Sequence, residues 1–415
     1  DLEYLNKLKV FNDPVHGFIS IPNELIFDII QHRYFQRLRR ICQTGMTELV
    51  YPGAKHTRFH HALGAMHLMQ KAVETLRKKN IEISEKEKIA VLCAILLHDI
   101  GHGPFSHTLE KTLIEDLNHE WVSLYLMEIL NSEFNGELDL AIQIFKGEYE
   151  RNFLTQLVSS QLDMDRLDYL KRDSFFTGVV EGNINPDRII STLNVKNDQL
   201  VVDSKGIYSI EKYLTARMFM YWQVYNHRTS FSAEVILTEV LRRAKELSNS
   251  GEKLFATDAL SFFLDSNSQN ETLKTKLDQF TRLDDSDIIA SIKQWQFQDD
   301  KILAYLSRSL INRDLPVSKI INQPLENSEI EKLREKAKLI VGAEDGSYFV
   351  HQSKISVLPY DQQKSAILIL NKDQSLQEIS QSPLQILAKN LVDPIEKYHL
   401  CYLAVKKKSS TQDVI

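Results

Sequence analysis

The pair His98-Asp99 carries the strongest chemical signal in the sequence, because it directly follows a long apolar run at residues 89–97. A helix that is apolar on all sides lies inside a protein. Burying an unpaired imidazole and carboxylate there would be costly, and a bound metal ion would explain why both are present. Together with His61 upstream and Asp165 downstream, the pair would form a divalent-metal shell of two imidazoles and two carboxylates.

Histidines are concentrated around this doublet: eight of the thirteen fall between positions 56 and 119. Histidine is the commonest neutral metal ligand and a natural acid or base near pH 7. Three of the eight, His56, His60 and His67, are also explained as surface or core residues. The candidates for proton transfer or phosphate contact are His102, His107, His119 and Glu120.

The segment around Asp165 places polar residues on one helical face. Asp165, Asp168, Tyr169 and Arg172 follow the spacing i, i+3, i+4, i+7, and Asp168 is spaced for an ion pair with Arg172. One interpretation is a solvated, salt-bridged helix face. The other is a carboxylate at Asp165 that completes the metal shell.

A shell of imidazoles and carboxylates suits a borderline-to-hard divalent ion, and no cysteine pattern indicates a structural zinc site. We therefore expect one divalent metal ion, drawn from Mn, Fe, Zn, Ni or Mg. Such an ion polarises a phosphoryl oxygen and lowers the pKa of a bound water. The residue types thus favour metal-dependent phosphate hydrolysis.

The composition is that of an ordinary globular protein of two or three domains, with 415 residues, 43% apolar and 26% charged. The formal net charge of −6 makes nucleic acid an unexpected partner, so an anionic substrate needs a local positive cluster. The three cysteines indicate no disulfide framework. Neither a signal peptide nor an apolar run of membrane-spanning length is evident, and we expect a soluble cytoplasmic protein.

Hydrophobic periodicity predicts a mainly helical protein. Helices are expected over residues 23–40, 59–79, 85–98, 106–117, 120–130, 152–175 and 211–247, the last broken near His227. A β-hairpin is predicted from residues 199–202 and 207–210. Strands at 366–370 and 400–405 are expected to flank a helix at 383–395. The predicted units are a catalytic core (1–247), a helical extension (248–338) and a small α/β C-terminal domain (339–415).

Five segments resemble the HD-domain phosphohydrolases, and within them the deoxynucleoside triphosphate triphosphohydrolases. They are KVFNDPVHG (9–17), FQRLR (35–39), YPGAKHTRFHHALG (51–64), LHDIGHGPFSH (97–107) and LDMDRLDYLKRD (162–173). Together these segments are far more specific than an HD doublet alone. The resemblance covers about residues 5–240. It implies an HD-domain helical core for residues 1–247, in a bacterial member of the subgroup.

Carried over by position, the resemblance implies a role for each candidate residue. The metal ligands would be His61, His98, Asp99 and Asp165. The residues around the scissile phosphate would be His107, as the acid, with Glu110, His119 and Glu120. Triphosphate binding falls to Arg58, His102, Arg166 and Arg217, and the deoxyribose would contact Gln43, Tyr169 and Asp173. The implied reaction converts a dNTP and water to a deoxynucleoside and triphosphate, with further Mg²⁺ on the nucleotide phosphates.

The resemblance also implies an effector nucleotide and a homo-oligomer, a dimer or tetramer. The effector contacts would be Lys9, Val10, Asn12, Gln36 and Arg39. Gln31, however, stands where guanine-regulated relatives carry an acidic residue, which argues against that type of control. His60 and Arg166 also depart from the residues common in relatives, Glu and Lys.

Other interpretations remain open at the level of the sequence. The same scaffold could cleave an alarmone, a cyclic nucleotide or a nucleoside monophosphate, although alarmone hydrolases usually lack the segments around His107 and Asp173. A nucleotide-sensing regulatory HD protein without turnover is another alternative. A helical interaction module would leave the clustered polar positions without an explanation.

Overall fold

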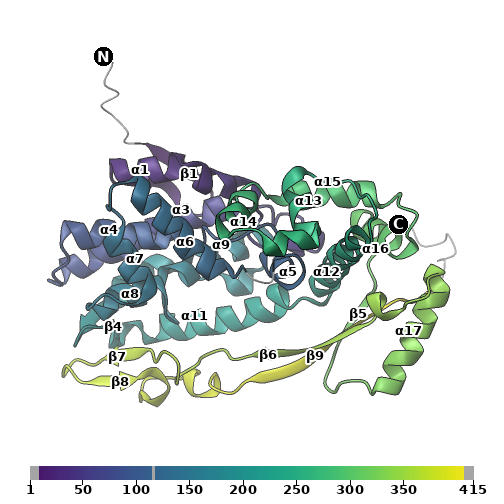
Figure 1. The fold of residues 1–415 in the computed structure, drawn as a ribbon. Coiled ribbons are helices and arrows are strands. Elements are labelled where there is room, and N and C mark those ends of the chain that lie inside the picture. Colours follow the sequence, from purple (N-terminus) through teal and green to yellow (C-terminus); the bar gives the residue numbers. More distant parts are fainter. Residues whose placement is uncertain (1–8, 115–116, 406–415) are drawn as a thin grey trace.

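The computed structural model describes residues 9–114 and 117–405, and the chain within these ranges is mainly helical with three small sheets (Figure 1). The predicted fold class is therefore confirmed. The outer ends of the first and third predicted domains, and residues 115–116 of the predicted helix 106–117, lie outside the described residues. The domain boundaries after residues 247 and 338 stay predictions.

Three helices form the centre of the molecule. α3 (Arg58–Lys78) packs against both α4 (Glu85–Leu97) and α9 (Met164–Thr177). A capping box between Ser84 and Glu87 begins α4, and every residue from Ala90 to Leu97 is buried. The predictions for α3 and α4 are thus confirmed, and the apolar run does place His98-Asp99 at the end of an interior helix.

The predicted helix 23–40 is wrong as a single element. It is divided at His32 into α1 (Glu24–Gln31), α2 (Arg33–Gln36) and a 3₁₀ turn (Arg37–Arg40). His32 has extended backbone dihedrals, and its Nδ1 accepts a hydrogen bond from the amide of Tyr34. Because this side chain caps a new helix, the helical hydrogen bonds restart there.

The predicted helix 152–175 is also two helices, α8 (Asn152–Val158) and α9. Asp163 separates them, because its carboxylate accepts hydrogen bonds from the amides of Ser160 and Arg166. This local bonding competes with a continuous helix and sets the start of α9 at Met164, one residue before Asp165.

The predicted β-hairpin is wrong in its residue range, because it begins and ends earlier in the chain. Its strands are β3 (Leu193–Lys196) and β4 (Gln199–Asp203), and the segment expected as the second strand begins α11 (Ile207–Met220). Asn197 and Asp198 join the strands with φ values of 52° and 58°, the left-handed pair that a two-residue hairpin turn requires. The expected break near His227 is confirmed, since a π-helical turn (Tyr221–Tyr225) precedes α12 (Arg228–Asn249).

Four further helices of the core surround this centre. They are α5 (Ser106–Thr112), α6 (His119–Glu133), α7 (Asp139–Lys146) and α10 (Pro186–Thr192). The helical extension follows with α13 (Asp258–Leu264), α14 (Leu273–Phe280), α15 (Asp285–Trp295), α16 (Lys301–Ile311) and α17 (Asn327–Val341). A strand, β5 (Val317–Ile321), interrupts this predicted helical stretch.

The C-terminal strands join two sheets that also use earlier segments. β6 (His351–Val357) and β9 (Ile395–Tyr402) pair with β5 in the order β5-β9-β6. β7 (Leu368–Leu370) pairs in parallel with β4, and β8 (Leu376–Glu378) completes that sheet. In Figure 1 these yellow strands run along the lower edge of the molecule, beside α11.

The helix predicted over residues 383–395 is wrong. Before β9 begins at Ile395, that range contains only a short 3₁₀ turn at Ala388–Asn390. The carboxylate of Glu211 on α11 accepts hydrogen bonds from the amides of residues 386–388, so the loop takes its backbone partners from the core rather than from itself. None of the helices in the described ranges is both long and apolar enough to cross a bilayer.

Candidate active site

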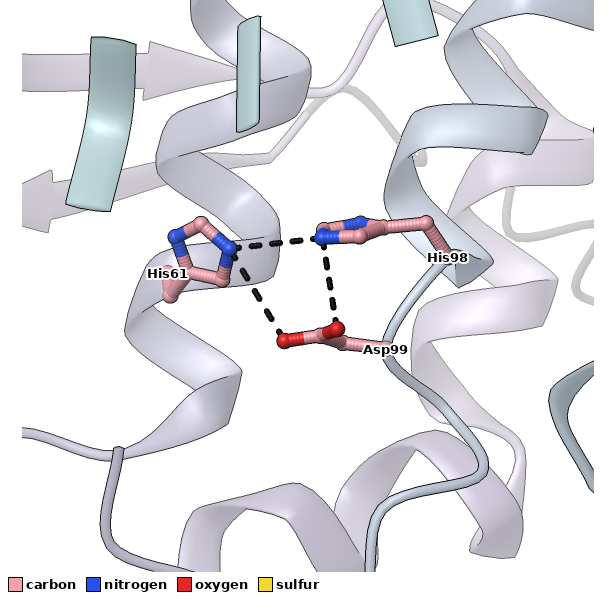
Figure 2. Close-up of side chains that lie close together, drawn as sticks. All are labelled: His61, His98 and Asp99. Atoms are coloured by element: carbon pink, nitrogen blue, oxygen red, sulfur yellow. Dashed lines mark hydrogen bonds and ion pairs between the residues drawn. The ribbon is translucent and has the colours of Figure 1, made fainter. Parts of the chain in front are cut away.

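Four side chains from three segments converge at the centre of the helical core. His61 comes from α3, His98 and Asp99 follow the last residue of α4, and Asp165 lies in the first turn of α9. His61 Nε2 lies 3.0 Å from Asp165 Oδ1 and 3.4 Å from His98 Nε2. Asp99 Oδ1 lies 3.4 Å from His98 Nε2. Figure 2 shows three of these side chains pointing toward one another.

Both imidazoles are oriented by a bond to the nitrogen that faces away from this centre. His61 Nδ1 lies 2.8 Å from Asp168 Oδ2, and His98 Nδ1 lies 2.5 Å from the carbonyl oxygen of Ile95. In each ring Nδ1–H donates, so Nε2 faces the centre and, once it has lost its proton, can offer its lone pair to a metal ion. This tautomer and aim are those of a metal-binding histidine, so the donor set fits a divalent ion.

Electrostatics in the metal-free protein agree with a cation at this position. Burial by itself would lower the pKa of His61, but hydrogen bonds with Asp165 and Asp168 outweigh it and raise that pKa to about 10. Burial is likewise outweighed at His98, where the charges of Asp99 and Asp165 raise the pKa to about 9. The carboxylates thus hold protons on both rings, in the place that a metal ion would take.

Asp99 is also tied to two residues predicted to bind phosphate. Arg58 Nη1 donates to Asp99 Oδ2 at 2.7 Å, and His102 Nε2 lies 3.2 Å from Asp99 Oδ1. Burial and the nearby charge of Arg58 lower the pKa of His102 to about 3, so this imidazole is neutral at pH 7. Arg58 therefore brings the positive charge to this side of the centre.

A second imidazole–carboxylate cluster lies beside the first. His119 Nδ1 lies 2.8 Å from Glu110 Oε1, and the ring of His119 stacks on His102 with 4.2 Å between centroids. His107 is edge-on to His119 at 5.8 Å. Glu120 is exposed, and its side chain bonds to none of the described residues, so three of the four predicted catalytic residues are brought together.

A cavity of about 390 Å³ opens next to these clusters. Five predicted site residues line it: Gln43, Arg58, His107, Tyr169 and Asp173. Its wall also contains residues that the sequence reasoning missed, which are Tyr221, Tyr225 and Glu234. No short motif marks these three, because they lie on α12 and the π-helical turn, outside the segments that resemble the family.

Asp173 is fixed in this cavity by two buried donors. Tyr225 donates its hydroxyl to Asp173 Oδ2 at 2.6 Å, and His56 Nε2 lies 2.6 Å from Asp173 Oδ1. His56 is fully buried and stacks on Phe176 with 4.6 Å between centroids. The core interpretation of His56 was therefore correct about burial, but this residue also positions a cavity carboxylate.

Several buried polar atoms around the cavity have no partner among the described residues. They are Gln43 Oε1, Arg58 Nε, His102 Nδ1, Arg166 Nε, and Nε and Nη1 of Arg217. Unpaired buried donors are costly, and a polyanionic ligand would satisfy those of Arg58, Arg166 and Arg217. Arg166 and Arg217 both act electrostatically on the Tyr169 hydroxyl, so they lie on the Tyr169 side of the site.

The predicted effector residues lie at the N-terminal hairpin, at the end of α2 and in the 3₁₀ turn that follows it. This hairpin consists of β1 (Val10–Asp13) and β2 (Gly17–Ser20). Val10 is 54% exposed, and Arg39 pairs with Gln36 at 2.9 Å while its guanidinium lies 3.8 Å from the ring centroid of Phe59. Their role in nucleotide binding stays a prediction.

Comparison with known proteins identifies the family. Residues 58–173 match the HD domain, and residues 184–345 match the HD associated region. A crystal structure of a phosphohydrolase from Bacteroides thetaiotaomicron has a TM-score of 0.91 and 48% identity, covering 96% of this chain and 100% of that one. This chain belongs to the HD-domain phosphohydrolase family, as a member with an HD-associated region.

Two further relatives extend the comparison. The uncharacterized protein YwfO of Bacillus subtilis is 36% identical over 91% of this chain and 88% of its own length. The deoxynucleoside triphosphate triphosphohydrolase SAMHD1 homolog of Dictyostelium discoideum is 29% identical over 59% of this chain. The alignment spans 51% of that relative, so the similarity concerns about half of it.

Proposed function

We propose that this protein hydrolyses deoxynucleoside triphosphates to a deoxynucleoside and inorganic triphosphate. The observation that carries this proposal is the cavity beside the metal centre, whose wall combines Gln43, Tyr169 and Asp173 with Arg58 and His107. These are the positions that resemble the sugar and phosphate contacts of the triphosphohydrolases. The similarity to the Dictyostelium homolog supports the same substrate class.

The metal would be held by His61, His98, Asp99 and Asp165. A divalent ion bound there would polarise a phosphoryl oxygen and lower the pKa of a water. Mn, Fe, Zn, Ni and Mg remain the candidate ions, because all accept imidazole nitrogen and carboxylate oxygen. The 25% exposure of the Asp165 side chain leaves this ligand accessible to a substrate.

The arginines and histidines would share the charge and proton handling. Arg58, Arg166 and Arg217 supply positive charge for a triphosphate, which is the local cluster that a chain of net charge −6 requires. Burial lowers the pKa of His107, and Glu110 opposes this effect. A bound polyphosphate would raise that pKa again, so that His107 can give a proton to the departing 5′-oxygen.

Sugar selection would rest on the Asp173 wall of the cavity. Each oxygen of Asp173 already accepts one hydrogen bond, from His56 or Tyr225, and retains a lone pair for a sugar hydroxyl. The same bonds hold the carboxylate rigidly. With Gln43 as a second polar contact to the 3′-hydroxyl and Tyr169 packed against C2′, the cavity would favour 2′-deoxy sugars.

Product analysis by anion-exchange chromatography tests this proposal. The purified protein would receive Mn²⁺ or Mg²⁺ with all four dNTPs together, then each dNTP singly, then rNTPs and ppGpp. We expect triphosphate and deoxynucleoside in equal amounts. Release of orthophosphate or pyrophosphate, or consumption of ppGpp with no dNTP turnover, would contradict it. Faster turnover in the mixture than with single dNTPs would support an effector nucleotide.

A further inference from the structure

A buried network connects the N-terminal hairpin to the metal centre. Arg172 on α9 lies between two carboxylates: its Nη1 donates to Asp13 Oδ1 at 2.7 Å, and its Nε donates to Asp168 Oδ2 at 2.9 Å. Asp168 and Arg172 are fully buried, and Asp13 is nearly so. These groups are remote from solvent, so each needs its partner to offset the cost of burial.

His16 is the second link between the hairpin and α9. Its Nε2 lies 2.6 Å from Asp168 Oδ1, and its side chain is 7% exposed. The other oxygen, Asp168 Oδ2, accepts from His61 Nδ1 at 2.8 Å. Asp168 therefore stands between a histidine of the hairpin turn and a candidate metal ligand.

The turn that carries these two residues is itself well defined. Asp13 Oδ2 accepts from the amides of Val15 and His16, at 3.0 and 2.8 Å. Gly17 closes the turn with a φ of +75°, a conformation that glycine adopts without strain. Asp13 thus folds the turn and anchors it to Arg172 with one carboxylate.

The packing of α3 adds an independent sign that the network is tightly held. A Cβ at Gly64 would lie 2.1 Å from Asp168 Oδ1 and 2.3 Å from Arg172 Nη2. The helix that bears His61 thus approaches Asp168 and Arg172 as closely as a glycine backbone allows. Asp168 therefore has no room to move closer to α3.

We propose that Asp13 and His16 are positioning residues of the metal centre, which hold Asp168 and through it aim His61 Nε2 at the metal. The β1–β2 hairpin is then a structural part of that centre. This inference rests on the metal site of the proposed function and is independent of the substrate. Mutating a residue that holds a metal ligand through hydrogen bonds typically lowers metal affinity by about 10- to 100-fold.

The test is the affinity of the purified full chain for Mn²⁺, measured by calorimetry after the metal is removed with a chelator. We expect His16→Ala to weaken Mn²⁺ binding by about 10- to 100-fold. His16→Gln should lose less, because an amide N–H can still reach Asp168. His67→Ala is the matched control: its ring lies 5.5 Å from that of His16, but it has no bond to Asp168.

The unfolding temperature of each metal-free variant separates positioning from general stability. A positioning role requires weaker binding in His16→Ala than in His67→Ala variants of similar metal-free stability. Mn²⁺ affinity within twofold of the parent, or equal losses in the two variants, would overturn the proposal. If His16→Ala does not fold, Asp13→Asn decides it by the same comparison. A parent that binds no Mn²⁺ would refute the metal site together with the positioning role, whereas Mn²⁺ binding without dNTP turnover would refute the substrate alone.

Discussion

The described part of the chain contains two imidazole–carboxylate clusters of almost the same composition. In each, two histidines and one acidic residue bring ligand atoms within 4.8 Å of one another. One cluster consists of His61, His98 and Asp99, and the other of His107, Glu110 and His119. The first lies in the helical core, while the second is more open and contains an exposed histidine.

The difference between them lies in what the outer nitrogen of each ring contacts. His61 and His98 are both tied through Nδ1, to Asp168 and to the Ile95 carbonyl, so only Nε2 faces the centre. The side chain of His107 makes no hydrogen bond with the described residues. A ring locked in one tautomer suits a fixed ligand, whereas an untied ring suits proton transfer. Composition alone does not separate these two roles.

The largest effect is expected when Asp165, the fourth predicted metal ligand beside the first cluster, is removed. Asp165→Ala should remove the bound metal and reduce dNTP turnover on the order of 10³-fold, because a metal contributes several kcal/mol to such reactions. Metal content by mass spectrometry and product release measure the two effects. Asp187→Ala, at an exposed ion pair with Lys71, is the control. An Asp165→Ala protein that kept both its metal and its activity would remove Asp165 from the ligand set.

Breaking the second cluster should separate activity from metal binding. His107→Gln is expected to lower kcat by about 10²-fold while the metal content stays that of the parent, because general acid catalysis contributes roughly this much. Steady-state kinetics and metal analysis on one preparation check it. Full activity would remove the acid assignment, and lost metal would show that the two clusters share the ion.

A variant outside both clusters should change substrate choice more than rate. Gln43 Oε1 is buried at the cavity without a protein partner. Losing a contact to the 3′-hydroxyl there costs on the order of 1 kcal/mol and would loosen the sugar against Tyr169, so Gln43→Ala should reduce the preference for dGTP over GTP by roughly fivefold. The ratio of kcat/KM values for the two substrates measures this. A parent with equal kcat/KM on dGTP and GTP would refute the sugar-selection role.

The smallest expected effect is on the pH dependence of stability, and it concerns the first cluster alone. In the folded, metal-free protein the pKa of His61 is about 10 and that of His98 about 9, both above the usual 6.5. Their stabilisation is fully present below pH 6.5 and is lost as pH rises toward 9 to 10. The unfolding temperature of the metal-free protein should therefore fall over that range.

In the metal-loaded protein, the unfolding temperature should change with pH in the opposite direction. Metal binding requires unprotonated imidazoles, so binding releases protons and becomes stronger as pH rises. With Mn²⁺ present, the unfolding temperature should rise between pH 6 and 8. A parallel response with and without Mn²⁺ would indicate that the first cluster does not hold the ion.

Local signals were sufficient for the helices that carry the metal centre. The Ser84 capping box and the apolar run predict α4, and the spacing of Asp165, Asp168 and Arg172 predicts their common face on α9. Predictions failed where a side chain took over the backbone bonding. His32 and Asp163 each restart a helix, and Glu211 holds a distant loop out of helical geometry.

The candidate site was likewise predictable from local segments but not in its long-range contacts. Residues within the family-like segments were found from the sequence, and the structure places most of them around one centre and one cavity. The bonds of Tyr225 and His56 to Asp173, and of His16 to Asp168, were not foreseen. These pairs join residues far apart in the chain, and no periodicity or spacing in a single sequence encodes such contacts.

The parallel pairing of β4 with β7 has a consequence for folding while the chain is being synthesised. β4 leaves the ribosome long before β7 does. Until β7 is made, the amides and carbonyls on the outer edge of β4 have no strand partner. Such an edge recruits other strands, and closing it requires a slow, long-range contact. Chains that stop near residue 345, where the HD-associated match ends, would keep that edge open. The last part of the chain thus also covers a strand edge at which nascent cores would otherwise pair with one another.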